Sequence, residues 1–419
     1  MIRDRSVTSR DAKEALEDDS LNRNIYLNNF ISSLNSINRN TIIAIDGGWG
    51  SGKTYFVKEL EYIAKNEEKF HKIEKEVVEK FRHKYDLFYF NAWENDDLPP
   101  LESILYRMAK EFWGVRENLA NKAIGVAKGI INFPVAFISG GSMSNDNFTE
   151  GYIDQHIKRA KNVIELHDKI EDLISNNYDE SKKDILFVID DLDRCNPSFA
   201  VNLLESIKHH FTSEHVVFII CANNSELQHT IKKYYGEQFN GMEYLNRFYD
   251  IIFSLPTPDV KQYLAQRFKD VDLNYVDKEV ALDVARMENM SLRQVNRYFS
   301  TLELLTRFFD GSSLSHEGKI GRSVKFVFTP IACALKLLRP EEYEIFVIGK
   351  GEEILKRYIA SCDQVSQIDK EAEPNGTLLS LVDCYKEIFK ESTRHYQCAD
   401  TFKEATSLLG YSIEIDGEE

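Results

Sequence analysis

The segment GGWGSGKT, residues 47–54, most constrains what this chain can fold into. It follows the hydrophobic run Thr41–Asp46, which predicts a buried strand, and it precedes a charged stretch whose apolar residues have helical spacing. In a segment of the form GxxxxGK(S/T), glycines let backbone N–H groups turn inward around phosphates, and the following helix adds partial positive charge. A plain glycine turn is the alternative, and the strand–loop–helix setting disfavours it. The sequence therefore predicts a phosphate-binding loop.

Every residue of this loop is a predicted contact for a bound nucleotide: Gly47, Gly48, Trp49, Gly50, Ser51, Gly52, Lys53 and Thr54. Lys53 is predicted to reach the β and γ phosphates and to act in catalysis, and the Thr54 hydroxyl is predicted to ligate Mg²⁺. Trp49 has a simpler alternative role, because aromatic side chains beside such a loop more often pack than stack on a base.

A second chemical signal is the acidic end of another hydrophobic run, in LFVIDDLDRC. Asp190 is predicted to associate with Mg²⁺, and Asp191 is placed to polarise the attacking water. The alternative for Asp191 and Asp193 is that they cap the following turn or pair with Arg194.

Hydrophobic segments alternate with helical patterns along the first part of the chain, at residues 41–46, 86–93, 184–190, 216–223 and 250–256. The amphipathic stretch 198–211 lies between two of them and predicts a right-handed βαβ crossover. Such alternation indicates an α/β fold with a parallel central sheet covered on both faces, a three-layer α/β/α architecture.

Three motifs together resemble the signatures of the KAP family of P-loop NTPases: GGWGSGKT, FNAW at residues 90–93 and IDDLDRC at residues 189–195. Their order and spacing also match, and the resemblance covers residues 21–309. It implies a Mg²⁺-dependent nucleoside triphosphatase whose nucleotide state drives assembly or a conformational switch. ATP is the expected nucleotide, because no NKxD motif for guanine follows the core strands. A homo-oligomer or a protein partner and a role in prokaryotic defence are expected with it.

The resemblance also assigns roles to three polar residues. Asn223 ends the segment 216–223 at a position where the family usually has an aspartate, so the resemblance implies a γ-phosphate sensor without the charge. Arg247 stands where an arginine finger could act across a subunit interface, and a surface ion pair is its alternative. Arg293 resembles a lid arginine that touches phosphates, and a solvated helix face is its alternative.

The pattern predicts a P-loop NTPase core at residues 1–258 with a helical insertion at about 95–180. A helical lid is expected at 259–310, then a linker at 311–323 and a C-terminal helical domain at 324–419. The sequence does not indicate what this last domain does.

The net charge of −16 and the cysteines limit the partners and the compartment. Such acidity disfavours a protein that coats nucleic acid through a basic surface, although a local basic groove could still form. The six cysteines include no CxxC pair, which disfavours a zinc site or a disulfide framework and favours a reducing, cytoplasmic location.

The apolar segment 123–141 approaches the roughly 20 residues that cross a bilayer. Lys128 and Pro134 inside it favour a buried or interfacial segment, whereas KAP proteins often carry transmembrane helices in this interval. We therefore expect a cytoplasmic chain that could dock to a membrane here. Two rival functions stay open: a membrane-associated nucleotide-binding scaffold with little turnover, and a nucleic-acid-stimulated motor.

Overall fold

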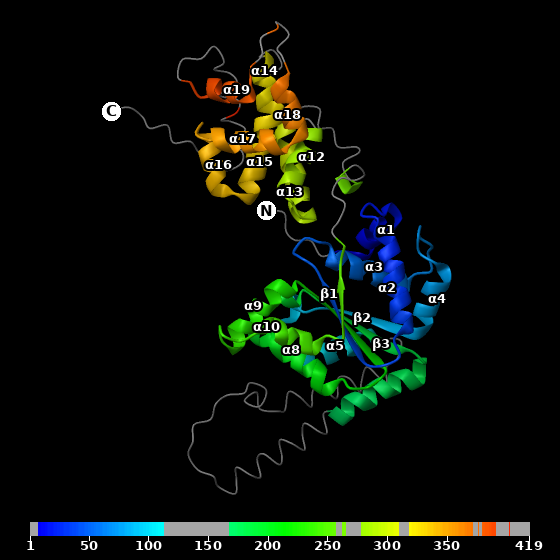
Figure 1. Cartoon of the computed structure of the whole chain (residues 1–419). Coiled ribbons are helices and arrows are strands. Elements are labelled where there is room, and N and C mark those ends of the chain that lie inside the picture. Colours follow the sequence, from blue (N-terminus) through cyan, green and yellow to red (C-terminus); the bar gives the residue numbers. More distant parts are fainter. Residues whose placement is uncertain are drawn as a thin grey trace, which may run out of the picture. The chain divides into compact units, whose positions relative to one another are not determined.

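The computed structural model describes residues 7–112, 167–256, 262–264, 278–309, 318–371, 376, 379–390 and 402. The chain divides into two compact units, Met1–Thr257 and Pro258–Glu419 (Figure 1), and each is described by itself. Within the described ranges, no helix is long and apolar enough to cross a membrane. The segment 123–141 lies outside them.

The first unit is built on one parallel sheet with the strand order β2-β3-β4-β1-β5. The strands are β1 (Thr41–Asp46), β2 (Tyr85–Asn91), β3 (Asp184–Asp190), β4 (Val216–Ala222) and β5 (Ile251–Ser254). Because the strands are parallel, all their carboxyl ends lie at the same edge of the sheet. This confirms the predicted α/β class with a parallel central sheet.

One face of the sheet is covered by the helices α1 (Ser9–Asp18), α2 (Asn24–Ser36), α3 (Lys53–Lys65) and α4 (Lys75–Lys84) (Figure 1). Alternate residues of a strand point to opposite faces. Ile43, Ile45 and Leu186 accordingly share a buried cluster with Phe56 of α3 and Leu27 of α2.

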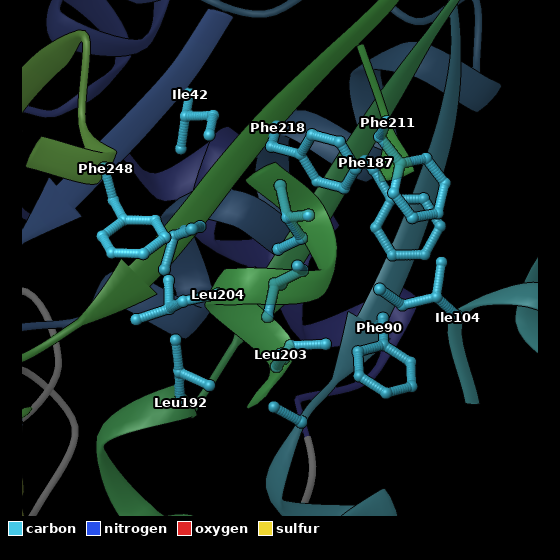
Figure 2. Close-up of a cluster of buried hydrophobic side chains, with 14 of the residues drawn as sticks. Ile42, Phe90, Ile104, Phe187, Leu192, Leu203, Leu204, Phe211, Phe218 and Phe248 are labelled. Carbon is cyan, nitrogen blue, oxygen red and sulfur yellow. The ribbon is translucent and has the colours of Figure 1, made fainter. Parts of the chain in front are cut away.

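The opposite face is covered by α5 (Pro100–Phe112), the helical residues 167–181, α8 (Pro197–His210), α9 (Asn224–Tyr235) and α10 (Gly241–Phe248). Figure 2 shows part of this core, where Ile42, Phe187 and Phe218 of the sheet meet Leu203 of α8 and Phe248 of α10. The two buried faces make the sheet the middle of three layers, as predicted.

The FNAW motif leaves the sheet earlier than the sequence predicts. β2 begins at Tyr85 and ends at Asn91, and Trp93 lies in a 3₁₀ turn, Trp93–Asn95. The Asn91 side chain accepts a hydrogen bond from the Glu94 N–H at 3.1 Å, and the Asn91 carbonyl accepts one from the Asn95 amide at 2.8 Å. These local hydrogen bonds turn the chain out of the extended conformation.

In the second unit the described residues are almost all helical and share one buried core, from Leu264 to Phe402. The helices are α12 (Lys278–Met287), α13 (Leu292–Phe309), α14 (Gly318–Ser323), α15 (Thr329–Leu338), α16 (Pro340–Val347), α17 (Glu352–Ser361), α18 (Asp363–Lys370) and α19 (Leu381–Ile388). α13 and α12 both pack against α15.

The linker predicted at 311–323 is wrong for its last six residues. α14 begins at Gly318 and continues through a π-helical turn, Val324–Phe328, into α15. Ile320 and Lys319 are buried, and the Lys319 ammonium donates to the carbonyls of Asp369 and Glu371 at 3.0 and 2.6 Å. This stretch contains two glycines and several polar residues, so its composition predicted a linker and not a helix.

Candidate functional site

The glycine loop connects β1 to α3 in the way its sequence predicts. Gly50 and Gly52 have φ angles of 76° and 92°, a region that residues with a Cβ rarely adopt. A Cβ at Gly47 would lie 2.7 Å from the Ser51 hydroxyl oxygen, so a side chain there would require this hydroxyl to move. α3 begins directly after the loop, at Lys53. The first N–H groups of this helix therefore face the loop, the arrangement that binds phosphate in other proteins.

Lys53 lies folded into the loop that precedes it. Its ammonium donates to the carbonyl of Gly47 at 2.6 Å and to that of Gly48 at 3.3 Å. The side chain is buried, so its charge is held close to the loop backbone and away from bulk water. One positive charge thus lies inside the loop.

Asp190 is the most deeply buried carboxylate at this edge of the sheet, with no exposed surface. It accepts hydrogen bonds from the Tyr89 hydroxyl at 3.0 Å and from the Asp191 N–H at 2.9 Å, and it also bonds to the Thr54 side chain. Burial and then the neighbouring Asp191 carboxylate raise the pKa of Asp190 to about 6. The Thr54 hydroxyl and the Asp190 carboxylate are hard oxygen ligands side by side, which fits Mg²⁺.

Asp191 has different surroundings. It adopts a left-handed conformation with φ 59° and ψ 31°, and its carboxylate lies 3.1 Å from Nε of Arg194. The amide of Asn91, on the neighbouring strand end, donates to it at 3.3 Å. Burial raises the pKa of Asp191, and Arg194 opposes that shift. The ion pair with Arg194 is the alternative that the sequence left open for this residue.

Asp193 contacts the phosphate loop, which the sequence did not predict. The Trp49 indole N–H donates to the Asp193 carboxylate at 2.6 Å, and the two residues are 144 positions apart. Asp193 is buried, whereas about half of the Trp49 side chain is exposed. Trp93 receives the Arg194 guanidinium over its ring at 5.5 Å. The sequence of the turn after β3 does not indicate that Asp193 would contact Trp49, 144 positions away.

Asn223 lies at the carboxyl end of β4, beside the loop strand. The register pairs Ala222 with Asp46, so Asn223 follows at the edge where the loop begins, and it is the N-cap residue of α9. Its neighbour Asn224 was not predicted as a site residue. The Asn224 N–H donates to the Asp46 carboxylate at 3.0 Å, and its side-chain oxygen accepts from the Tyr249 hydroxyl at 3.2 Å.

Two further predicted site residues are arginines on helices that do not carry this cluster. Arg247 lies in the last turn of α10, largely exposed, and pairs with Glu243 one helical turn earlier at 2.8 Å. Arg293 lies in the first turn of α13, which belongs to the second unit. The first unit therefore brings together the loop with Lys53 and Thr54, the carboxylates of Asp190 and Asp191, and Asn223.

A parallel sheet with a glycine loop between β1 and α3, and with buried acid at the end of β3, defines a P-loop nucleotide-binding domain. The sequence matches the model of the KAP family P-loop domain over residues 23–309. This match spans more than half of the chain, and the protein belongs to that family. No curated protein matches the chain. The family assignment agrees with the resemblance carried by the three motifs and indicates nucleotide binding and hydrolysis.

Proposed function

We propose that this protein is a Mg²⁺-dependent ATPase whose nucleotide state drives assembly or a conformational switch. The observation that carries the proposal is that the Thr54 side chain interacts with the buried Asp190 carboxylate. Thr54 is the second residue of α3, and Asp190 is the last residue of β3. In this proposal both hold Mg²⁺, one directly through the hydroxyl and one beside the metal's ligand shell.

Lys53 would change partners when the nucleotide binds. Its ammonium now donates to two loop carbonyls, and the oxygens of the β and γ phosphates are stronger acceptors because they are charged. Bound Mg²⁺ would neutralise charge on the same phosphates. The loop N–H groups from Gly47 to Thr54 would take the remaining phosphate oxygens, which leaves positioning and electrostatics as the main sources of catalysis.

Asp191 is assigned the water-orienting role. Its carboxylate is already aimed by Asn91 and Arg194, and its raised pKa makes it a better proton acceptor than an ordinary aspartate. Asn223 would sense the γ phosphate from the end of β4. Arg293 would contact the nucleotide phosphates, as the resemblance of its segment to a family lid arginine suggests.

Arg247 is assigned the role of an arginine finger for a neighbouring subunit. Its guanidinium is exposed, and an exposed ion pair such as the one with Glu243 is worth at most about 1 kcal/mol. Exchanging that carboxylate for a phosphate in a second copy of the chain would therefore cost little. The proposal requires an oligomer.

Phosphate release from ATP and from GTP over a protein-concentration series tests this proposal. Turnover per chain should rise with protein concentration, with ATP preferred. Arg247→Ala should bind ATP normally and lower kcat by about 10³-fold, because an arginine finger contributes on that scale. Arg286→Ala is the matched control, since Arg286 is also exposed and pairs with Asp283 at 3.1 Å.

The rival functions give other results in the same assay. Nucleotide binding with no turnover at any protein concentration would favour the scaffold. Co-sedimentation of the chain with liposomes would then show that this scaffold is membrane-associated. Turnover that rises with DNA or RNA and falls with salt would favour the motor. Equal kcat values for Arg247→Ala and wild type would show that Arg247 is not an arginine finger.

A further inference from the structure

Arg23 joins three segments that are far apart in the sequence. It precedes α2 and is almost completely buried. Its Nη2 donates to the Ser51 carbonyl in the phosphate loop at 2.7 Å and to the Pro256 carbonyl at 3.1 Å. Pro256 follows β5 and is the second-last residue of the first unit.

The burial of this guanidinium is costly for the fold. Its Nε and Nη1 are buried without a hydrogen-bond partner, and in the described part of the chain it forms no ion pair with a carboxylate. Burial lowers the pKa of Arg23, and only the more distant Glu59 acts in the opposite direction. An apolar side chain of similar size would fill the same space at lower cost. The two carbonyl contacts are what an apolar residue could not provide.

The contact with Ser51 fixes the direction of one peptide group in the loop. A trans peptide is planar, and its C=O and N–H point in opposite directions. The carbonyl of Ser51 points to Arg23, so the N–H of Gly52 in the same peptide points away from Arg23. Gly52 has the left-handed φ of 92° that places this peptide at the start of α3. N–H groups at that point form the anion-binding end of the helix.

We propose that Arg23 is a positioning residue that sets the Ser51–Gly52 peptide so that the Gly52 N–H faces a phosphate before the nucleotide arrives. The inference rests on the proposed nucleotide-binding function and adds a residue outside the loop motif. The shared Nη2 also ties the loop to the end of the first unit at Pro256. The ligand of the Gly52 N–H in this proposal is a phosphate chain, irrespective of the base attached to it.

Tripolyphosphate is the probe that isolates the loop, because it has no base or ribose. Its affinity and that of MgATP are measured by calorimetry for the full chain, with the thermal midpoint recorded for each variant. Arg23→Gln should weaken both affinities about tenfold or more, the loss of one preorganised charge-assisted contact. Arg82→Gln is the matched control: the Arg82 Nε also donates to a carbonyl, that of Ile63 at 2.7 Å, near the other end of α3.

Arg23→Lys carries the test if Arg23→Gln does not fold. The lysine ammonium lies one bond short of Nη2, so it cannot keep both carbonyl contacts, and tripolyphosphate binding should again weaken. Wild-type affinity in a folded Arg23→Gln or Arg23→Lys overturns the inference, even if the thermal midpoint falls. Weak binding in Arg82→Gln of the same size also overturns it, since the effect would then be general. Failure of the wild type itself to bind either probe overturns the proposed function as well.

Discussion

Two adjacent carboxylates at the end of β3 illustrate how neighbouring residues acquire different chemistry. Asp190 faces the Thr54 and Tyr89 side chains, and hydrogen bonds surround its carboxylate. Asp191 faces the Arg194 guanidinium instead. A bound cation would offset the cost of burying the Asp190 carboxylate, whereas the Asp191 carboxylate already pairs with the Arg194 guanidinium. This difference supports the assignment of the metal to Asp190 and of the water to Asp191.

Glu59 gives the clearest pH-dependent prediction. It is buried on α3, and burial raises its pKa to about 8, with Arg23 acting against the shift. The folded state therefore holds a proton that the unfolded state releases above about pH 4.5. The free energy of unfolding should fall as pH rises from about 4.5 towards about 8, since each pKa unit is worth about 1.4 kcal/mol.

Glu59→Gln removes this titration and keeps the shape of the side chain. Relative to wild type, the variant should gain stability as pH rises, by a few kcal/mol at pH 8 or above, in urea unfolding measured at several pH values. Glu79→Gln, an exposed residue paired with Lys75, is the control and should change little. Parallel curves for Glu59→Gln and wild type from pH 5 to pH 9 would contradict the prediction.

Several residues of the site could be predicted from the sequence because their signal is local. Lys53, Thr54 and Asp190 stand at fixed places relative to a strand and a helix, and the strand–loop–helix order sets their position. The contact between Trp49 and Asp193 depends instead on how the loop after β1 and the turn after β3 meet. Which loops lie next to each other depends on the order of the strands in the sheet, and a local sequence pattern does not determine that order.

At the scale of the elements, polar residues inside α14 were mistaken for a linker. Gly318 has a φ of 58° and starts the helix, and Lys319 is buried beneath α18. Its ammonium donates hydrogen bonds to carbonyls at the carboxyl end of α18, where carbonyl groups have no partner within their own helix. A lysine in a sequence normally indicates a solvated face, so only the packed structure reveals this role.

Lys319→Met should destabilise the second unit. The substitution fills a similar volume but leaves the Asp369 and Glu371 carbonyls without their charged donor, at a cost on the order of 3 kcal/mol. Hydrogen exchange of peptides from residues 318–371 measures the effect as faster opening. Lys386→Met, which removes an exposed ion pair with Glu352, should alter exchange only slightly. Unchanged exchange in Lys319→Met would show that α18 does not depend on this side chain.

At the scale of the whole molecule, the parts differ in how far the sequence could predict them. The three-layer core follows from alternating strands and helices, and its family is now assigned over residues 23–309. The second unit has one core that includes α12, α13 and the helices after residue 318. Helices pack in many arrangements with similar sequence patterns, so the division between a lid and a C-terminal domain could not be derived from periodicity. That division remains a proposal.

The central claim is that the loop around Lys53 binds MgATP and supports its hydrolysis. The most direct measurement is phosphate release at saturating MgATP by the wild type, Lys53→Ala and Lys65→Ala, with and without a chelator. Lys65 lies on the same helix, is exposed and pairs with Glu61 at 2.9 Å. We predict turnover that needs Mg²⁺, is unchanged in Lys65→Ala and falls at least 100-fold in Lys53→Ala. Turnover that persists in Lys53→Ala or in the chelator would contradict the account.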